Sequence, residues 1–196
     1  MDRTRGLRER KKDETRRAVY TAAMRLTVEH GFDQVTVEAI AEAANISRRT
    51  FSNYFACKGD AVLYGERLYT RALVDALRER PADEGAWTAL RACARDLYAS
   101  WSPWPDRGWA LRTRMARKHP SLLARQLTDH AVLARELEES LAGRARPGGP
   151  RPGLLVAVFL AGLRVGLDTW IDEEESRDLL EVVEEVLDEA EASFDR

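Results

Sequence analysis

Apolar residues recur every three or four positions along most of the chain, which is the pattern of helices that bury one face. In the first third of the chain, this pattern predicts helices over residues 13–30 and 37–44 and a short helix over residues 47–55. No segment shows the strict alternation of a half-buried strand. We therefore predict an all-α fold.

The short predicted helix divides its side chains between two faces when it is drawn at about 100° per residue. Its polar face holds Arg48, Arg49, Ser52 and Asn53. Its opposite, mainly aromatic face holds Thr50, Phe51, Tyr54 and Phe55. In DNA recognition, arginine binds guanine edges and phosphates, asparagine binds adenine, and serine binds either. The polar face therefore carries side chains that a DNA groove binds, although an ordinary surface helix with two arginines has the same composition.

Local signals make this helix the second helix of a helix-turn-helix. Thr36 and Ser47 stand where N-cap residues belong, and Asn45 in the turn tolerates a left-handed backbone. Two helices joined by a three-residue turn, with polar residues outward on the second, form this DNA-binding motif.

The rest of the chain predicts six further helices, so that the fold contains about nine. They span residues 58–80, 83–100, 106–118, 121–142, 154–171 and 176–193. We divide the chain into a helix-turn-helix domain, residues 1–58, and a larger helical domain, residues 59–196. Residues 1–12 are expected to form a flexible basic arm, either without a role or in contact with phosphates or the minor groove.

Charge is distributed unevenly along the 196 residues. Residues 1–58 carry 12 Lys/Arg against 8 Asp/Glu, a net charge of +4, whereas the remainder carries 19 against 25, a net charge of −6, which together give −2. A basic first third favours a polyanion partner at that end only. Chance variation of surface charge would give a difference of the same size.

Nothing in the sequence indicates catalysis or a metal. His30, His119 and His130 are far apart, and the two cysteines lack metal-ligand spacing. No nucleophile motif or Gly-rich phosphate loop is present. We therefore predict no catalytic residue, no metal site and no cofactor.

Free cysteines favour a reducing compartment, so we expect a cytoplasmic protein. The charged first residues lack the apolar region of a secretory signal. The longest apolar run, Leu154–Leu163, is too short to span a bilayer, so no membrane partner is expected.

Residues 15–63 resemble the DNA-binding domain of the tetracycline-repressor (TetR) family of bacterial regulators. The matching residues are Ala22, Ala23, Gly31, Phe32, Thr36, Val37, Ile40, Ala41, Ala44, Ile46, Ser47, Thr50, Tyr54, Phe55, Lys58 and Leu63. The family spacing is kept across all three helices without gaps. Three departures bear on packing: Thr27 stands where a large aromatic is usual, Cys57 where a Ser or Thr cap is usual, and Gly59 where an acid is usual.

The resemblance implies a set of DNA contacts. Thr36, Tyr54 and Lys58 would meet backbone phosphates. The residues that would face base edges or the groove margin are Arg48, Arg49, Ser52 and Asn53. Thr50 often touches DNA in such proteins, although the helical wheel places it on the inner side. Ser52 takes a position that is often aromatic, so base recognition here would depend more on hydrogen bonds.

The last two helices are predicted to form a homodimer interface, as is usual in the family, or else to complete a monomer core. The interface residues would be Leu155, Val158, Gly162, Gly166, Leu179, Val183, Val186 and Leu187. A ligand pocket is also implied, with ordinary core as the alternative. Its wall residues would be Leu97, Trp101, Trp104, Trp109, Met115, Leu123, Leu127, Phe159, Leu163 and Trp170.

The sequence thus predicts a dimeric regulator of transcription, a repressor that a small hydrophobic molecule releases from a palindromic DNA operator. The alternative is a helical small-molecule-binding or scaffold protein without operator activity. An enzyme is disfavoured because no catalytic constellation is present.

Overall fold

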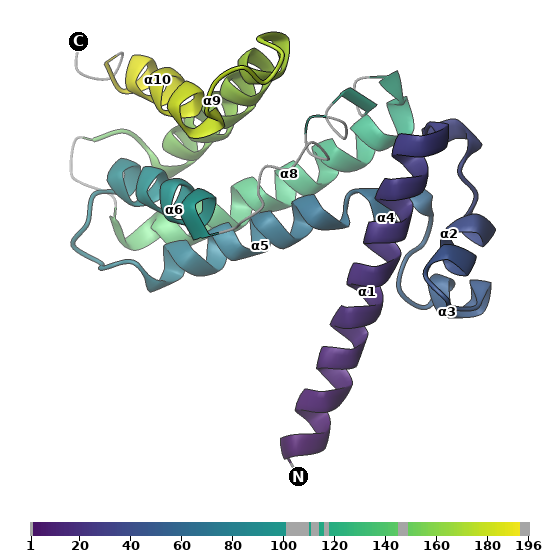
Figure 1. The fold of residues 1–196 in the computed structure, drawn as a ribbon. Coiled ribbons are helices and arrows are strands. Elements are labelled where there is room, and N and C mark those ends of the chain that lie inside the picture. The colour runs from purple at the N-terminus through teal and green to yellow at the C-terminus, as the bar shows by residue number, and fades with distance from the viewer. Residues whose placement is uncertain (1, 101–109, 111–113, 116–117, 145–148, 193–196) are drawn as a thin grey trace. The chain divides into compact units, whose positions relative to one another are not determined.

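The computed structural model describes residues 2–100, 110, 114–115, 118–144 and 149–192, with side chains from residue 8 onward. In these residues every regular element is a helix, which confirms the all-α prediction (Figure 1). The chain forms two compact units. The first unit holds residues 1–68 and 111–126, and the second holds residues 69–110 and 127–196. The first unit therefore continues past residue 58, the boundary predicted from the sequence.

The first unit contains α1 (Asp2–His30), a 3-10 turn η1 (Phe32–Gln34), α2 (Val37–Ala43), α3 (Arg48–Ser52) and α4 (Lys58–Val62). Its core consists of apolar side chains from all four helices and from η1, together with two residues from the later part of the chain. They include Val19, Ala23, Phe32, Ile40, Phe51, Phe55, Val62, Met115 and Leu122. Asn45 adopts φ 54°, the left-handed backbone predicted for the turn.

The first helix begins at Asp2 instead of Asp13, so the arm expected for residues 1–12 is helical from residue 2 (Figure 1). The segment is rich in Arg and Lys, which have good helix propensity, and Lys12 pairs with Glu9 at 2.7 Å one turn away. Side chains 8–11 are exposed. Residues 2–12 lack apolar periodicity because this part of the helix buries no face, and not because it is not helical.

The second unit is built from α5 (Tyr64–Glu79), α6 (Ala86–Ser100), α8 (Pro120–Leu141), α9 (Pro152–Asp172) and α10 (Leu179–Ala192), with a 3-10 turn η2 (Ala142–Arg144). The one long helix predicted over residues 58–80 is divided at Leu63 into α4 and α5. Both α5 and α8 run from one unit into the other. The helix predicted over residues 106–118 lies mostly outside the described residues.

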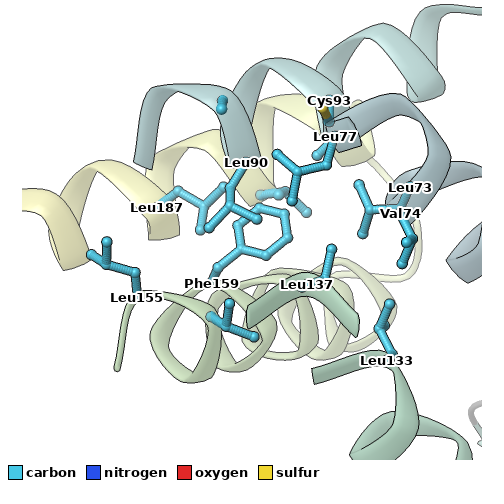
Figure 2. Close-up of a cluster of buried hydrophobic side chains, with 14 of the residues drawn as sticks. Leu73, Val74, Leu77, Leu90, Cys93, Leu133, Leu137, Leu155, Phe159 and Leu187 are labelled. Atoms are coloured by element: carbon cyan, nitrogen blue, oxygen red, sulfur yellow. The ribbon is translucent and has the colours of Figure 1, made fainter. Parts of the chain in front are cut away.

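Figure 2 shows the core of the second unit, where side chains from these five helices meet. Phe159 is fully buried, and its ring centroid lies 6.4 Å from that of Trp87. Burial also raises the pKa of the Cys93 thiol to about 11. Arg144 of η2 donates to the carbonyls of Leu77, Arg80, Pro81 and Glu84, and so caps the end of α5.

Helix α9 packs closely against α10 because two of its glycines leave room. A Cβ added at Gly162 would lie 2.6 Å from Leu187 Cδ2, and one at Gly166 would lie 2.9 Å from the Cα of Val183. By length and composition alone α9 is apolar enough to cross a membrane, but less than half of its most apolar stretch is buried. Core helices of water-soluble proteins pass the same test, so this finding assigns nothing by itself.

Candidate nucleic-acid interface

Both predicted N-caps of the helix-turn-helix are formed. The Thr36 hydroxyl accepts from the Ala39 backbone N–H at 3.1 Å, and the Ser47 hydroxyl accepts from the Thr50 N–H at 3.0 Å. The Thr50 side chain is tied to the same cap, with its oxygen 2.8 Å from that of Ser47. Thr50 is half-buried, in agreement with its predicted inner position.

The two predicted faces of α3 are also confirmed. Phe51 and Phe55 are buried, their ring centroids lie 5.7 Å apart, and Phe55 meets the ring of Tyr64 edge-on at 5.6 Å. The exposed side chains are Arg48, Arg49, Ser52 and Asn53. A five-residue helix is far too short to be stable alone, so the aromatic face holds α3 on the unit while the polar face points to solvent.

Arg48 makes an ion pair that the sequence did not predict. Its Nε lies 3.0 Å from Oε1 of Glu38, in the first turn of α2. Both side chains are largely exposed, at 73% for Arg48 and 58% for Glu38. The pair joins the two helices of the motif on the surface that carries the exposed α3 side chains.

Tyr54 is half-buried beside α1. The guanidinium carbon of Arg16 lies 5.6 Å from the centre of the Tyr54 ring. A contact of this kind restrains the ring and places a cation over it. Periodicity gives no sign of Arg16, because the contact joins residues 38 positions apart in the chain.

Lys58, for which the resemblance implies a phosphate contact, makes contacts within the first unit in this structure. Its ammonium donates to three carbonyls of the segment around η1, those of Phe32 at 2.8 Å, Val35 at 2.9 Å and Asp33 at 3.2 Å. It also lies 4.5 Å from the centre of the Phe32 ring. An ammonium group has three N–H donors, and three protein acceptors match that number. In this structure Lys58 holds the segment that leads into Thr36.

The start of α4 is fixed by an acid that the sequence analysis did not single out. Cys57 makes no side-chain cap, as its identity suggested, but the Asp60 carboxylate accepts the Ala56 backbone N–H at 3.2 Å. Asp60 is 6% exposed and is paired with Arg67 of α5 at 3.2 Å and Arg125 of α8 at 2.7 Å. This carboxylate therefore joins three helices of the first unit.

Thr27 and Gly59 show what their departures from the family pattern do to packing. Thr27 is 2% exposed, and its hydroxyl has no hydrogen-bond partner among the described residues. At Gly59 an added Cβ would lie 3.0 Å from Cδ2 of Leu122, so the missing side chain is replaced by a leucine of α8. Among the described residues, the first unit thus buries the Thr27 hydroxyl without a partner, in addition to the paired Asp60 carboxylate.

The predicted pocket wall is divided between the two cores and the surface. Phe159 and Trp170 are buried in the second unit, where Leu97 and Leu163 pack against the same cluster, and the indole N–H of Trp170 donates to the Arg177 carbonyl at 2.8 Å. Met115 belongs to the core of the first unit. Leu123 and Leu127 are exposed, and Trp101, Trp104 and Trp109 lie outside the described residues. Apolar spacing indicated burial but did not indicate which core each side chain joins.

Most residues predicted for a dimer interface are buried within the chain itself, where they join α9 to α10. These are Leu155, Gly162, Gly166, Leu179, Val183 and Leu187. Val158 and Val186 are half-buried. The apolar side chains that α9 leaves exposed lie on another face of the helix, at Leu154, Ala157, Ala161 and Val165.

A capped helix-turn-helix with an exposed polar face, in a chain whose described elements are all helical, defines a DNA-binding transcriptional regulator. Among the described residues no cluster of metal-binding side chains accompanies it. Residues 19–62 match the family model of bacterial regulatory proteins of the tetR family, and residues 84–195 match the model of the MftR C-terminal domain. The chain is also 33% identical over 175 residues to the HTH-type transcriptional regulator TcmR of Streptomyces glaucescens, covering 84% of this chain and 76% of that protein. It belongs to the tetR family.

Solved structures share the fold. FadR of Thermus thermophilus, a repressor of the family in complex with lauroyl-CoA, aligns with a TM-score of 0.61 at 23% identity, over 88% of this chain and 91% of that one. SmeT, the repressor of the Stenotrophomonas maltophilia multidrug efflux pump SmeDEF, aligns with a TM-score of 0.64 at 17% identity, over 92% of each chain. The family models and the relative confirm the resemblance stated from the sequence, and the solved structures confirm the fold.

Proposed function

We propose that the protein is a cytoplasmic, homodimeric repressor that places α3 in the major groove of a palindromic operator. The single observation that carries the proposal is the exposed polar face of α3, which presents Arg48, Arg49, Ser52 and Asn53 on a helix whose other face is locked in the core. Such side chains bind base edges and groove-lining phosphates.

Three flanking residues support this interface. Thr36 caps α2, so that its exposed first turn is available to a phosphate, and Tyr54 places its phenol beside Arg16 at the other side of α3. Lys58 contributes by holding the η1 segment, which sets the position of Thr36.

A second copy of the chain would pack on the exposed apolar face of α9. Leu154 and Val165 are 52% and 41% exposed, and Ala157 and Ala161 lie between them on the same side of the helix. Small residues at the centre of such a face allow helices to approach closely, and a two-fold axis places two recognition helices one DNA turn apart, about 34 Å.

The ligand is proposed to be small and hydrophobic. Two neighbours of the same fold were solved with ligands that are apolar at least in part, FadR with lauroyl-CoA, which carries a twelve-carbon acyl chain, and SmeT with triclosan. Because α5 and α8 each contribute to both units, a ligand that shifts either helix in the second unit would also move the residues that hold α4.

The test of the proposal combines two measurements on the full chain. Selection from a randomised duplex DNA pool should yield a palindrome, with binding that weakens steeply as salt rises. Sedimentation should give a dimer that Ala161→Glu converts to a monomer. If the protein binds all duplexes with the same affinity, operator recognition is refuted. If the wild-type protein binds the selected DNA as a monomer, dimerisation is refuted.

A further inference from the structure

The ion pair between Glu38 and Arg48 places a negative charge on the surface proposed to meet DNA. Glu38 lies in the first turn of α2, two residues after the Thr36 cap, and its side chain is 58% exposed. A carboxylate there repels phosphates and lowers affinity for DNA of any sequence. Its contact with the recognition helix offers a compensating role.

The atoms of the contact show what that role is. Arginine has five N–H donors, and Glu38 Oε1 lies nearest to the nitrogen of one of them, Nε, at 3.0 Å. Because the ion pair is made through Nε, the edge formed by the two terminal nitrogens takes no part in it. That edge can donate two parallel hydrogen bonds to O6 and N7 of a guanine.

Arg48 needs such a partner because little else restrains it. Its side chain is 73% exposed at the first position of α3, and a free arginine of this kind samples many rotamers. A preformed orientation reduces the entropy lost on binding the correct base.

We propose that Glu38 is a positioning residue that aims Arg48 at one guanine, while its charge weakens binding to DNA of every sequence by repelling phosphates. It thus increases discrimination at the expense of total affinity, as repulsive elements do in other specific interfaces. The inference rests on the proposed function, since it assumes that α3 enters the groove.

Glu42 provides a matched control for the charge. It is also an exposed glutamate of α2, one helical turn after Glu38, and it forms no ion pair with α3 in the described part of the chain. Glu42→Ala therefore removes the same charge from the same helix without touching Arg48.

The experiment begins with duplexes selected by the wild-type protein at about 0.15 M salt, where charges are screened beyond roughly 8 Å. The base pair at which Arg48→Ala loses its sequence preference is the one that Arg48 recognises. Glu38→Ala should lower the preference at that same base pair about two- to five-fold, the range for an exposed ion pair, while binding to a scrambled duplex becomes tighter. Glu38→Gln, which keeps an acceptor without charge, should fall between Glu38→Ala and the wild type.

A double-substitution cycle separates positioning from charge alone. In a protein that already carries Arg48→Ala, Glu38→Ala should cause no further loss of discrimination. If Glu38→Ala instead raises affinity for selected and scrambled duplexes by the same factor, as Glu42→Ala is expected to do, Glu38 acts only through repulsion and the inference is wrong. If Glu38→Ala and Glu42→Ala unfold at the same temperature as the wild type, a change in folding does not cause the difference in DNA binding. A wild-type protein without any sequence preference would refute the proposed function itself.

Discussion

Lys58→Met distinguishes a lysine that binds DNA from one that holds the protein together. The substitution keeps most of the aliphatic stem beside the Phe32 ring but removes three charged N–H donors from the carbonyls of Phe32, Asp33 and Val35. Hydrogen bonds to charged groups contribute roughly 1.5–3 kcal/mol each when a buried partner loses them. Part of this site is exposed, and water can replace some of these bonds, so we expect a total loss of about 2–3 kcal/mol.

The assay measures stability and DNA binding in parallel. Urea unfolding of the variant, followed by a signal from the first unit, should show a lower midpoint with an unchanged slope. DNA affinity should be measured across a salt series, because each phosphate contact contributes about 0.9 to the slope of log K against log salt. A lysine that only holds η1 leaves that slope unchanged when affinity falls.

Arg49→Ala is the control, since Arg49 is exposed on the polar face of α3 and should change DNA binding with little change in stability. The reasoning is refuted if Lys58→Met unfolds at the wild-type urea concentration while its salt slope falls by about 0.9 per subunit. That result would mean that the ammonium leaves the three carbonyls and binds phosphate in the complex.

Three further predictions concern stability. Thr27→Val replaces a buried, unpaired hydroxyl by a methyl group and should stabilise the protein by about 1 kcal/mol in urea unfolding; a loss of stability would mean that the hydroxyl is paired. Gly166→Ala should destabilise by about 1–3 kcal/mol because its Cβ meets the α10 backbone, whereas Gly143→Ala, with open space around it, should be close to neutral. The pKa of Tyr98 is raised to about 12, first by burial and then by its hydrogen bond to Asp178. The phenol of the unfolded chain ionises near pH 10, so Tyr98 contributes fully to the free energy of unfolding below pH 10, and this contribution is lost as the pH rises to 12. In Tyr98→Phe, the free energy of unfolding should no longer show this decrease between pH 10 and 12.

The helix-turn-helix could be predicted because its signals are local. The caps of Thr36 and Ser47 each act on a residue three positions later, and the turn at Asn45 needs only a residue that tolerates positive φ. The division of α3 into two faces follows from a period of 3.6 residues. None of these features depends on the rest of the chain.

The contacts that complete the interface could not be predicted because they join distant positions. Lys58 reaches carbonyls 23 to 26 residues earlier, and Arg125 reaches Asp60 across 65 residues. A lysine or an arginine on a helix is compatible with solvent, DNA or protein partners. The sequence supplies the charge, and the packing of helices selects the partner.

The sequence by itself thus determined an all-helical regulator with a recognition helix, since periodicity and caps are properties of short segments. The tertiary structure decided what each buried residue packs against. Gly162 and Gly166 leave the room that a close helix contact needs, yet the contact is with α10 of the same chain. The apolar face that α9 leaves exposed is the one that carries Leu154 and Val165. An apolar pattern indicates that a side chain is buried. Only the packing of the helices determines the surface that buries it.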